Sequence, residues 1–230
     1  MKPLPTHEIE TGTSPTASII WMHGLGADGY DFAPIISELA LPSNPAIRFI
    51  FPHAPVRPVT LNQGRPMRAW YDVSGFDREI NEDRAGIEQS AAEIRNLIQL
   101  ENNRGNPPSH VLLAGFSQGG AVALYTGLGY PEKLAGIMVL SSYLPLRANL
   151  HDNLNPANMA TPIFMAHGYY DPVINIEFSR KSCDELKSAG LTVDWREYPM
   201  AHSVSKTEIS DISAWIQLVL AQVKKSSRSK

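Results

Sequence analysis

A serine stands between two glycines at the point where one apolar segment meets another. Gly115, Ser117 and Gly119 form the pattern G-x-S-x-G, in which residues 111–116 are typical of a buried strand and residues 118–128 of a helix. A strand that runs directly into a helix turns so sharply that the residue at the turn takes a strained backbone and presents its side chain. The pattern predicts that Ser117 is a nucleophile, although a serine that merely caps a helix would also fit it.

A serine hydroxyl attacks a carbonyl only with the help of a base, and that base needs a carboxylate to orient it. In hydrolases with this turn the chain order is serine, acid, histidine. Three histidines follow Ser117, and only His202 lies late enough for a strand-end acid to precede it. We expect Asp171 to be that acid, because the proline after it disfavours a helical backbone and keeps the carboxylate in a loop. Asp194 and Glu197 are rivals, but they lie within a strand-like segment.

A second glycine-rich turn, Gly24–Gly29, matches G-x-G-x-x-G and raises the alternative of a dinucleotide-binding protein. Such a site also needs an acidic residue at the end of the next strand, where the sequence FIFPHAP has no carboxylate. We instead expect the Leu25 N–H to form one half of an oxyanion hole and the Gln118 N–H to form the other. His23 precedes Ser117 in the chain, so we expect a structural histidine that braces the turn. A non-catalytic ligand-binding protein on the same kind of scaffold is a further alternative.

Composition and charge exclude several classes of function. Lys and Arg together number 20 against 23 Asp and Glu, so the chain lacks the basic surface that binding to nucleic acid requires. The single cysteine, Cys183, has no partner for an internal disulfide, and we expect it to pack in the interior. The first residues lack the apolar core of a secretory signal, and no stretch approaches the roughly 18 apolar residues of a membrane span. We therefore expect a cytoplasmic protein, and, with no cluster of metal ligands in the sequence, neither a metal nor a cofactor.

Short apolar segments alternate with amphipathic ones along the chain, which predicts an α/β fold. The expected strands cover residues 17–22, 47–51, 111–116, 135–140, 162–167 and 191–198. Apolar residues at helical spacing predict helices around residues 32–39, 80–98, 118–128 and 209–220. Strands that are buried on both faces and alternate with helices predict one domain, residues 1–230, with a mostly parallel central sheet covered by helices on both faces. Residues 145–160 are expected to form a surface loop, and residues 224–230 a flexible basic tail.

The segment 57–76 is too long for a plain connection and carries apolar side chains that a solvated loop would not hold. We expect it to lie over the carboxyl ends of the strands as a lid that walls an acyl-binding groove beside the serine. Leu61, Met67 and Trp70 are the expected substrate contacts. The alternative is that Trp70 and Tyr71 begin a strand and pack into the core, because large aromatic side chains are usually buried.

Four motifs together resemble the carboxylesterase, phospholipase and acyl-protein thioesterase family of the α/β-hydrolase fold. They are IIWMHGLGADGYDF (19–32), GFSQGG (115–120), HGYYDPVI (167–174) and MAHSV (200–204), and the resemblance runs from about residue 18 to residue 220. The stretch RAWYD (68–72) is similar to the family's tryptophan-containing stretch beside the acyl pocket. The resemblance implies a carboxylic ester hydrolase with a Ser117, Asp171 and His202 triad, an oxyanion hole from Leu25 and Gln118, and no cofactor.

The same resemblance implies which partners the protein meets. Acyl esters, acyl thioesters, lysophospholipids and acylated proteins are the expected substrates, and a homodimer is left open. Two stretches depart from the family's pattern: PVIN (172–175) follows the acid where a valine pair and a proline are usual, and the turn after the histidine is only loosely similar. Neither departure removes a catalytic group, but both leave the acyl-chain preference undecided.

Overall fold

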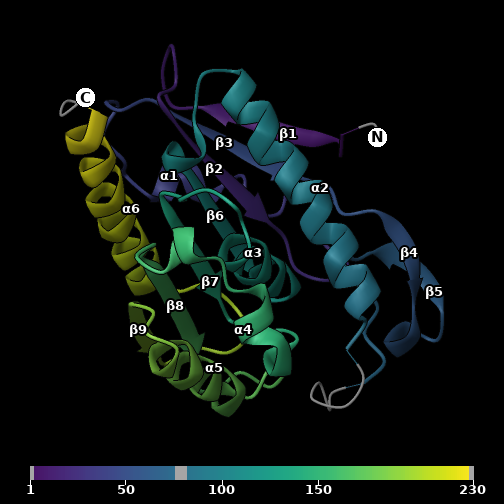
Figure 1. Ribbon diagram of the computed structural model, residues 1–230. Coiled ribbons are helices and arrows are strands. Elements are labelled where there is room, and N and C mark those ends of the chain that lie inside the picture. The colour runs from purple at the N-terminus through teal and green to yellow at the C-terminus, as the bar shows by residue number, and fades with distance from the viewer. Residues whose placement is uncertain (1–2, 76–81, 228–230) are drawn as a thin grey trace.

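A seven-stranded sheet forms the centre of the molecule (Figure 1). The structure is a computed structural model that describes residues 3–75 and 82–227. In spatial order the strands are β1 (Thr6–Glu10), β3 (Ile47–Pro52), β2 (Ala17–Met22), β6 (Val111–Phe116), β7 (Gly136–Leu140), β8 (Ile163–Gly168) and β9 (Val193–Tyr198). β1 runs antiparallel to β3, and every other neighbouring pair is parallel. The predicted single domain with a mostly parallel sheet is confirmed.

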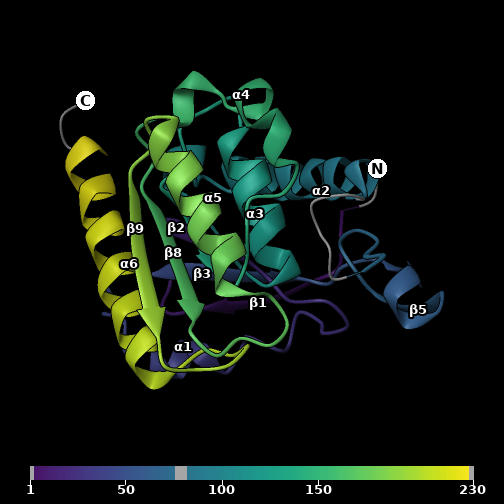
Figure 2. The same cartoon turned by 90° about the horizontal axis from the view of Figure 1, so that it is seen from below.

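Helices cover both faces of this sheet (Figure 2). α1 (Ile35–Glu38) and α6 (Lys206–Ser227) lie on one face, whereas α2 (Arg84–Asn103), α3 (Gln118–Leu128) and α5 (Ile176–Ser188) lie on the other. Alternation along β2 shows how one strand serves both layers: Ile19 and Trp21 pack in the cluster that includes α6, and Ile20 and Met22 pack in the cluster that includes α2. Because both faces are buried, the strand has no solvent-facing side, which is why its sequence is apolar apart from Ser18, whose buried hydroxyl donates to Glu101.

All six predicted strands are present, with ends within two residues of the predicted ones. The prediction missed β1, whose sequence THEIE is mostly polar because this strand is at the edge of the sheet and only half-buried. The helix expected around residues 32–39 is present only as α1, a single turn of four residues. Ile80, which was expected to begin the next helix, lies outside the described residues.

The segment 57–76 is not an irregular loop, which corrects the prediction. Its first half is a hairpin in which β4 (Val56–Val59) pairs antiparallel with β5 (Arg65–Arg68), and the short 3₁₀ turn η1 (Thr60–Asn62) joins them. The hairpin projects beside the sheet (Figure 1). Hydrogen bonds from the Leu61 N–H to the Val73 carbonyl (2.7 Å) and from the Thr60 N–H to the Asp72 carboxylate (2.7 Å) fasten its tip. Phe76, at the end of the predicted lid, lies outside the described residues.

Two further predictions of irregular structure are wrong. Residues 145–160 contain three short helical segments, η3 (Arg147–Asn149), α4 (Leu150–Asn153) and η4 (Pro156–Asn158). α6 continues to Ser227, so most of the segment predicted as a flexible tail, 224–230, is helical. Within the described residues no helix is both long and apolar enough to cross a membrane.

Candidate active site

Ser117 occupies the turn between β6 and α3, where the chain changes direction within one residue. Its backbone has φ 53° and ψ −122°, a conformation that costs a non-glycine residue on the order of 1–3 kcal/mol. The Ser117 N–H donates to the Leu140 carbonyl at the end of β7 (2.8 Å), which ties the turn to the neighbouring strand. The residue is 7% exposed, so its hydroxyl is sheltered but reachable.

Glycines around Ser117 allow this turn because a Cβ at their positions would overlap backbone atoms. A Cβ on Gly115 would lie 2.2 Å from the carbonyl carbon of Gly119, and one on Gly119 would lie 2.3 Å from the Met22 carbonyl oxygen. Gly24, in the second glycine-rich turn, approaches from the other side, and a Cβ placed there would be 3.5 Å from the Ser117 Cβ. The two glycine-rich motifs of the sequence therefore meet at the serine.

Asp171 and His202 come together although 31 residues separate them. The His202 Nδ1 lies 2.6 Å from the Asp171 Oδ2, and the Asp171 side chain has no exposed surface. The other carboxylate oxygen, Oδ1, accepts from the N–H groups of Val173 (2.8 Å) and Ile174 (2.9 Å). Burial alone would raise the pKa of Asp171, but hydrogen bonds from two histidines and the Ile174 N–H hold it well below its ordinary value of 3.8. Asp171 is therefore a carboxylate at neutral pH.

The rival acids are engaged elsewhere. Asp194 pairs with Arg196 (2.8 Å) on the surface, and Glu197 pairs with the Arg180 guanidinium through both oxygens (2.9 and 2.8 Å). Neither carboxylate has a hydrogen bond to His202 among the described residues.

Phe116, the residue before the serine, contacts the histidine. The Phe116 ring lies 4.7 Å from the His202 ring, centroid to centroid, and the His202 side chain is 16% exposed. Within the described residues no hydrogen bond joins the Ser117 hydroxyl to His202. Catalytic hydrogen bonds of this kind are often long in an enzyme without substrate and tighten when the substrate binds.

Two backbone N–H groups, one in each of the two turns that meet at the serine, have no acceptor among the described residues. Among the described residues neither the Leu25 N–H nor the Gln118 N–H makes a hydrogen bond, and Gln118 is the first residue of α3. Unpaired N–H groups at a helix N-terminus carry partial positive charge that favours an anion. The arrangement can therefore hold a negatively charged oxygen that develops beside Ser117.

His23 braces the turn that carries Leu25, as predicted. Its Nε2 accepts from the Ala54 N–H (3.0 Å), so the proton of the neutral ring is on Nδ1, which donates to the Gly24 carbonyl (2.7 Å). The ring is buried, and burial lowers the pKa of His23 to about 4. His23 is thus a neutral structural residue.

Trp70 supports this turn from within the core, which corrects the prediction that it contacts substrate. The residue has no exposed surface and packs in the core between β2 and α2, as does Tyr71. The Trp70 indole N–H donates to the His23 carbonyl (2.9 Å), and the Trp70 backbone N–H donates to the Gln118 Oε1 (2.8 Å). The Gln118 Nε2 in turn donates to the Tyr71 carbonyl (2.7 Å). Sequence reasoning missed that this segment connects the two halves of the proposed oxyanion hole.

The hairpin lies against the glycine-rich turn through β5, the strand that carries Met67, one of its two predicted contact residues. The Gly26 N–H donates to the Arg68 carbonyl (2.9 Å), which fixes β5 against the glycine-rich turn. A Cβ on Gly26 would lie 3.7 Å from the Met67 sulfur, so Met67 lies over that turn. Leu61 lies at the tip of the hairpin and is 37% exposed.

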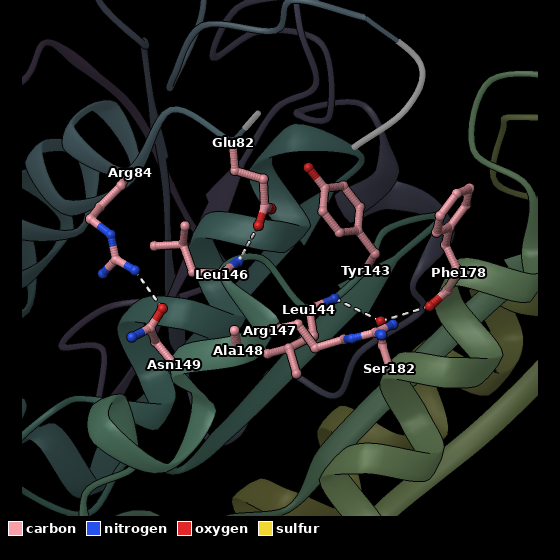
Figure 3. A pocket seen from close by; sticks show the side chains of 10 residues that line it. All are labelled: Glu82, Arg84, Tyr143, Leu144, Leu146, Arg147, Ala148, Asn149, Phe178 and Ser182. Atoms are coloured by element: carbon pink, nitrogen blue, oxygen red, sulfur yellow. Dashed lines mark hydrogen bonds between the residues drawn. The ribbon is translucent and has the colours of Figure 1, made fainter. Parts of the chain in front are cut away.

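A pocket of about 390 Å³ is lined largely by the segment that follows β7 (Figure 3). Tyr143 adjoins it, three residues beyond the Leu140 carbonyl that holds the serine, and its hydroxyl lies 3.0 Å from that of Tyr71. Figure 3 shows Phe178 and Ser182 of α5 on one side of the pocket and Arg84 on the other. The lining residues are Glu82, Arg84, Tyr143, Leu144, Leu146, Arg147, Ala148, Asn149, Phe178 and Ser182. Sequence reasoning missed these residues because most of them lie in or beside the segment that it treated as a surface loop.

Two other kinds of site find no support. No group of three His, Cys, Asp or Glu side chains that could hold a metal ion occurs in the described part of the chain. The Gly24–Gly29 turn is followed by the four-residue α1 and not by a long helix whose N-terminus could hold a pyrophosphate.

Cys183 is buried in the core, as predicted, and burial raises the pKa of its thiol.

Comparison with known proteins agrees with this geometry. The family model described as Phospholipase/Carboxylesterase matches residues 5–220. Acyl-protein thioesterase 1 of Mycosarcoma maydis is 38% identical over 227 residues, which cover 91% of this chain and 94% of that protein. Acyl-protein thioesterase 1 of Neurospora crassa is 39% identical over 224 residues, which cover 94% of this chain and 91% of that protein.

Solved structures match over the same extent. The crystal structure of Arabidopsis thaliana SOBER1 superposes with a TM-score of 0.83 at 32% sequence identity and covers 89% of this chain and 99% of that chain. The crystal structure of Zea mays acyl-protein thioesterase 2 superposes with a TM-score of 0.83 at 30% identity and covers 94% of this chain and 99% of that chain. The fold is therefore that of these α/β-hydrolase-like enzymes.

Proposed function

Because this chain belongs to the phospholipase/carboxylesterase family and is a hydrolase of esters or thioesters, we propose that it cleaves them through an acyl-enzyme formed on Ser117. The observation that carries the proposal is the convergence of a strained serine, a paired acid and histidine, and two N–H groups without acceptors at one edge of the sheet. Each of these groups has a separate task in acyl transfer, and removal of any one of them would leave the reaction incomplete.

In the first half of the reaction the Ser117 Oγ bonds to the carbonyl carbon of the substrate. The hydroxyl proton passes to the Nε2 of His202, because its Nδ1 is committed to Asp171. The carbonyl oxygen becomes an oxyanion that accepts hydrogen bonds from the Leu25 and Gln118 N–H groups. The bond from carbon to the leaving oxygen or sulfur then breaks, and His202 returns its proton to the leaving group.

In the second half, water replaces the leaving group. His202 takes a proton from the water, whose oxygen bonds to the acyl carbon, and the same two N–H groups hold the second oxyanion. The bond between the acyl carbon and the Ser117 Oγ breaks, and the proton on His202 restores the serine hydroxyl. The products are a carboxylic acid and free enzyme, so neither a metal nor a cofactor has a task in the cycle.

The substrates we propose are acyl esters and acyl thioesters, including lipids and acylated proteins. Two relatives bear the name acyl-protein thioesterase 1, which supports an acylated protein as substrate. The pocket beyond β7, with Tyr143, Leu144, Leu146 and Phe178 in its lining, offers apolar surface for an acyl chain. Met67 and Leu61 of the hairpin are proposed to wall the groove from the opposite side.

The test is a series of matched esters and thioesters whose acyl chains lengthen by two carbons at a time. Each buried CH₂ contributes up to about 0.8 kcal/mol, so kcat/KM should rise with chain length until the groove is filled. Replacement of both Leu61 and Met67 by serine should lower kcat/KM more for the long acyl chains than for acetate, with little change in Tm.

Two outcomes would contradict the proposal. Failure of the wild-type protein to hydrolyse any ester or thioester in the series would contradict the activity itself. An equal loss for acetate and long-chain substrates in the double variant, or a large fall in Tm, would contradict the proposed contacts of Leu61 and Met67.

A further inference from the structure

The two loops that carry the acid and the histidine of the proposed triad lie against each other. They are residues 169–175, after β8, and residues 199–205, after β9, and they run side by side beyond the ends of these strands (Figure 2). The Tyr170 N–H donates to the Met200 carbonyl (3.0 Å), two residues before His202. The exposed side chains of both loops are therefore parts of one surface.

This surface is apolar and uncharged. Three of the eight exposed large apolar side chains among the described residues belong to it: Tyr170 is 71% exposed, Tyr169 48% and Val173 40%. Neither loop contains a lysine, an arginine or a glutamate, and their one aspartate and one histidine are Asp171 and His202. Contiguous exposed apolar surface marks a site of interaction. We define the aromatic patch as the exposed residues Tyr169, Tyr170, Pro172, Val173, Pro199 and Ala201.

Tyr170 has no task inside the protein that would explain an aromatic residue at its position. Its ring lies 6.4 Å from the Tyr169 ring, centroid to centroid, and the two planes are inclined by 55°. Within the described part of the chain its hydroxyl makes no hydrogen bond. An aromatic ring stabilises a structure mainly through the area that it removes from water, and most of this ring stays in water. The ring is therefore available to another molecule.

The position of the patch determines which part of the substrate it meets. In the proposed reaction His202 gives its proton to the leaving group, which must lie beside His202 when its bond to the acyl carbon breaks. The acyl chain is proposed to lie in the pocket lined by residues within 82–84, 143–149 and 178–182, none of which belongs to the two loops. The patch beside His202 is thus left for the leaving group.

The composition of the patch favours one kind of leaving group. A lysophospholipid leaves as an alcohol that carries a phosphodiester, and binding of a phosphate requires cations. The first lysine beyond the two loops, Lys206, belongs to α6, and Arg180 and Arg196 on the neighbouring α5 and β9 are already paired with acidic side chains. A small alcohol or thiol would not cover two tyrosines. A peptide offers apolar and amide surface, which tyrosine side chains contact well.

We propose that the aromatic patch binds the polypeptide of an acylated protein next to its acylated residue, and that Tyr170 is a specificity-determining residue for this leaving group. The proposal deepens the proposed function and rests on it, because it places the leaving group beside His202. The enzyme then prefers a peptide thioester to a thioester of a small thiol with the same acyl group, and Tyr170 accounts for much of this preference.

The first experiment compares two thioesters that share an octanoyl group. In one, the group is on the cysteine of a short uncharged peptide with apolar residues on both sides; in the other, it is on N-acetylcysteamine, a small thiol. Tyr170→Ser should lower kcat/KM about fivefold more for the peptide than for the small thioester, whereas Tyr170→Phe, which keeps the ring, should retain most of the preference. Leu218→Ser is the matched control, because Leu218 is 60% exposed on α6 and lies outside both loops.

The second experiment measures binding without turnover. A peptide of the same sequence whose cysteine carries an octyl thioether cannot be cleaved, and calorimetry gives its Kd. We expect Tyr170→Ser to raise this Kd about fivefold and Leu218→Ser to leave it unchanged. Such a result in a wild-type protein that cleaves neither thioester would support the patch and refute the proposed function, so the two proposals fail separately.

Three outcomes would overturn the proposal. An equal loss for both thioesters in Tyr170→Ser, or a large fall in its Tm, would mean that the ring supports the acid and histidine loops and not the leaving group. Unchanged kinetics and an unchanged Kd would mean that the patch does not meet the peptide. If Tyr170→Ser instead weakens sedimentation with vesicles of phosphatidylcholine and phosphatidylserine, and the preference for the peptide persists, the patch contacts a lipid surface.

Discussion

The serine and the acid of the proposed site lie at the same edge of one sheet, but different forces hold them. Ser117 is set by backbone contacts: its neighbours Gly115 and Gly119 have no room for a side chain, and its own N–H is bound to β7. Asp171 is set by hydrogen bonds, with two N–H donors on one oxygen and the imidazoles of His167 and His202 around the other. The proposed nucleophile is placed by shape, and the proposed acid is placed by polar contacts.

This difference predicts how each region fails. A substitution that adds an atom at the serine turn should lower stability, because the neighbouring backbone segments must move apart to make room for it. A substitution at Asp171 that keeps the volume of the side chain should lower activity and leave stability nearly unchanged. Packing is preserved, but the histidine is no longer oriented for proton transfer. Three substitutions, from the largest expected effect to the smallest, break or sharpen this contrast.

Asp171→Asn should lower kcat by on the order of 10²-fold to 10⁴-fold, with only a modest change in Tm. The amide keeps the size of the side chain but favours the wrong tautomer of His202. Steady-state kinetics on a soluble ester measures the loss, and Asp194→Asn is the control, because that carboxylate pairs with Arg196 on the surface. A large loss in Asp194→Asn together with near-normal activity in Asp171→Asn would mean that the acid has been misassigned.

Gly119→Ala should lower the free energy of unfolding by about 3 kcal/mol, because its Cβ would lie 2.3 Å from the Met22 carbonyl oxygen. Thermal and denaturant unfolding measure the change. Gly75→Ala is the control, since a Cβ at that position meets nothing within 4 Å. Equal stability of the two variants would show that close backbone approach does not fix the serine turn.

Glu208, at the start of α6 after the loop that carries His202, should make stability depend on pH. The residue is buried, and burial raises the pKa of its carboxyl group from 4.5 to about 8. Between those two values the folded protein holds a proton that the unfolded chain has released, so stability falls as pH rises from about 4.5 to about 8.

Glu208→Gln should remove this pH dependence while it keeps the shape of the side chain. Its Tm relative to that of the wild-type protein should therefore rise between pH 5 and pH 8, and the corresponding change in the free energy of unfolding is about a few kcal/mol at most. A Tm difference that is constant over this range would show that Glu208 is ionised in the folded protein throughout, contrary to this account.

The same contrast explains what the sequence reveals. The strands and the serine turn depend on neighbours in the chain, so the apolar run 111–116 and the pentapeptide around Ser117 predict them. The pairing of Asp171 with His202 spans 31 residues, yet the fixed order of serine, acid and histidine in such folds, together with the place of Asp171 beyond the end of a strand, predicts that pair as well.

Other features depend on contacts that no local pattern encodes. Trp70 is aromatic and lies near the expected groove, but its indole N–H is used by the His23 carbonyl inside the core. The lining of the pocket beyond β7 likewise depends on how the segment after Leu140 folds back. Such features become visible only when the elements are assembled.

The central claim is that Ser117 is the nucleophile, and covalent trapping tests it most directly. A fluorophosphonate reacts with an activated serine, forming a bond from the serine oxygen to phosphorus as fluoride leaves, and peptide mass spectrometry locates the adduct. The account predicts one adduct per chain, on Ser117, complete loss of labelling in Ser117→Ala, and much slower labelling in His202→Asn. An adduct on another residue, or labelling that persists in Ser117→Ala, would contradict it.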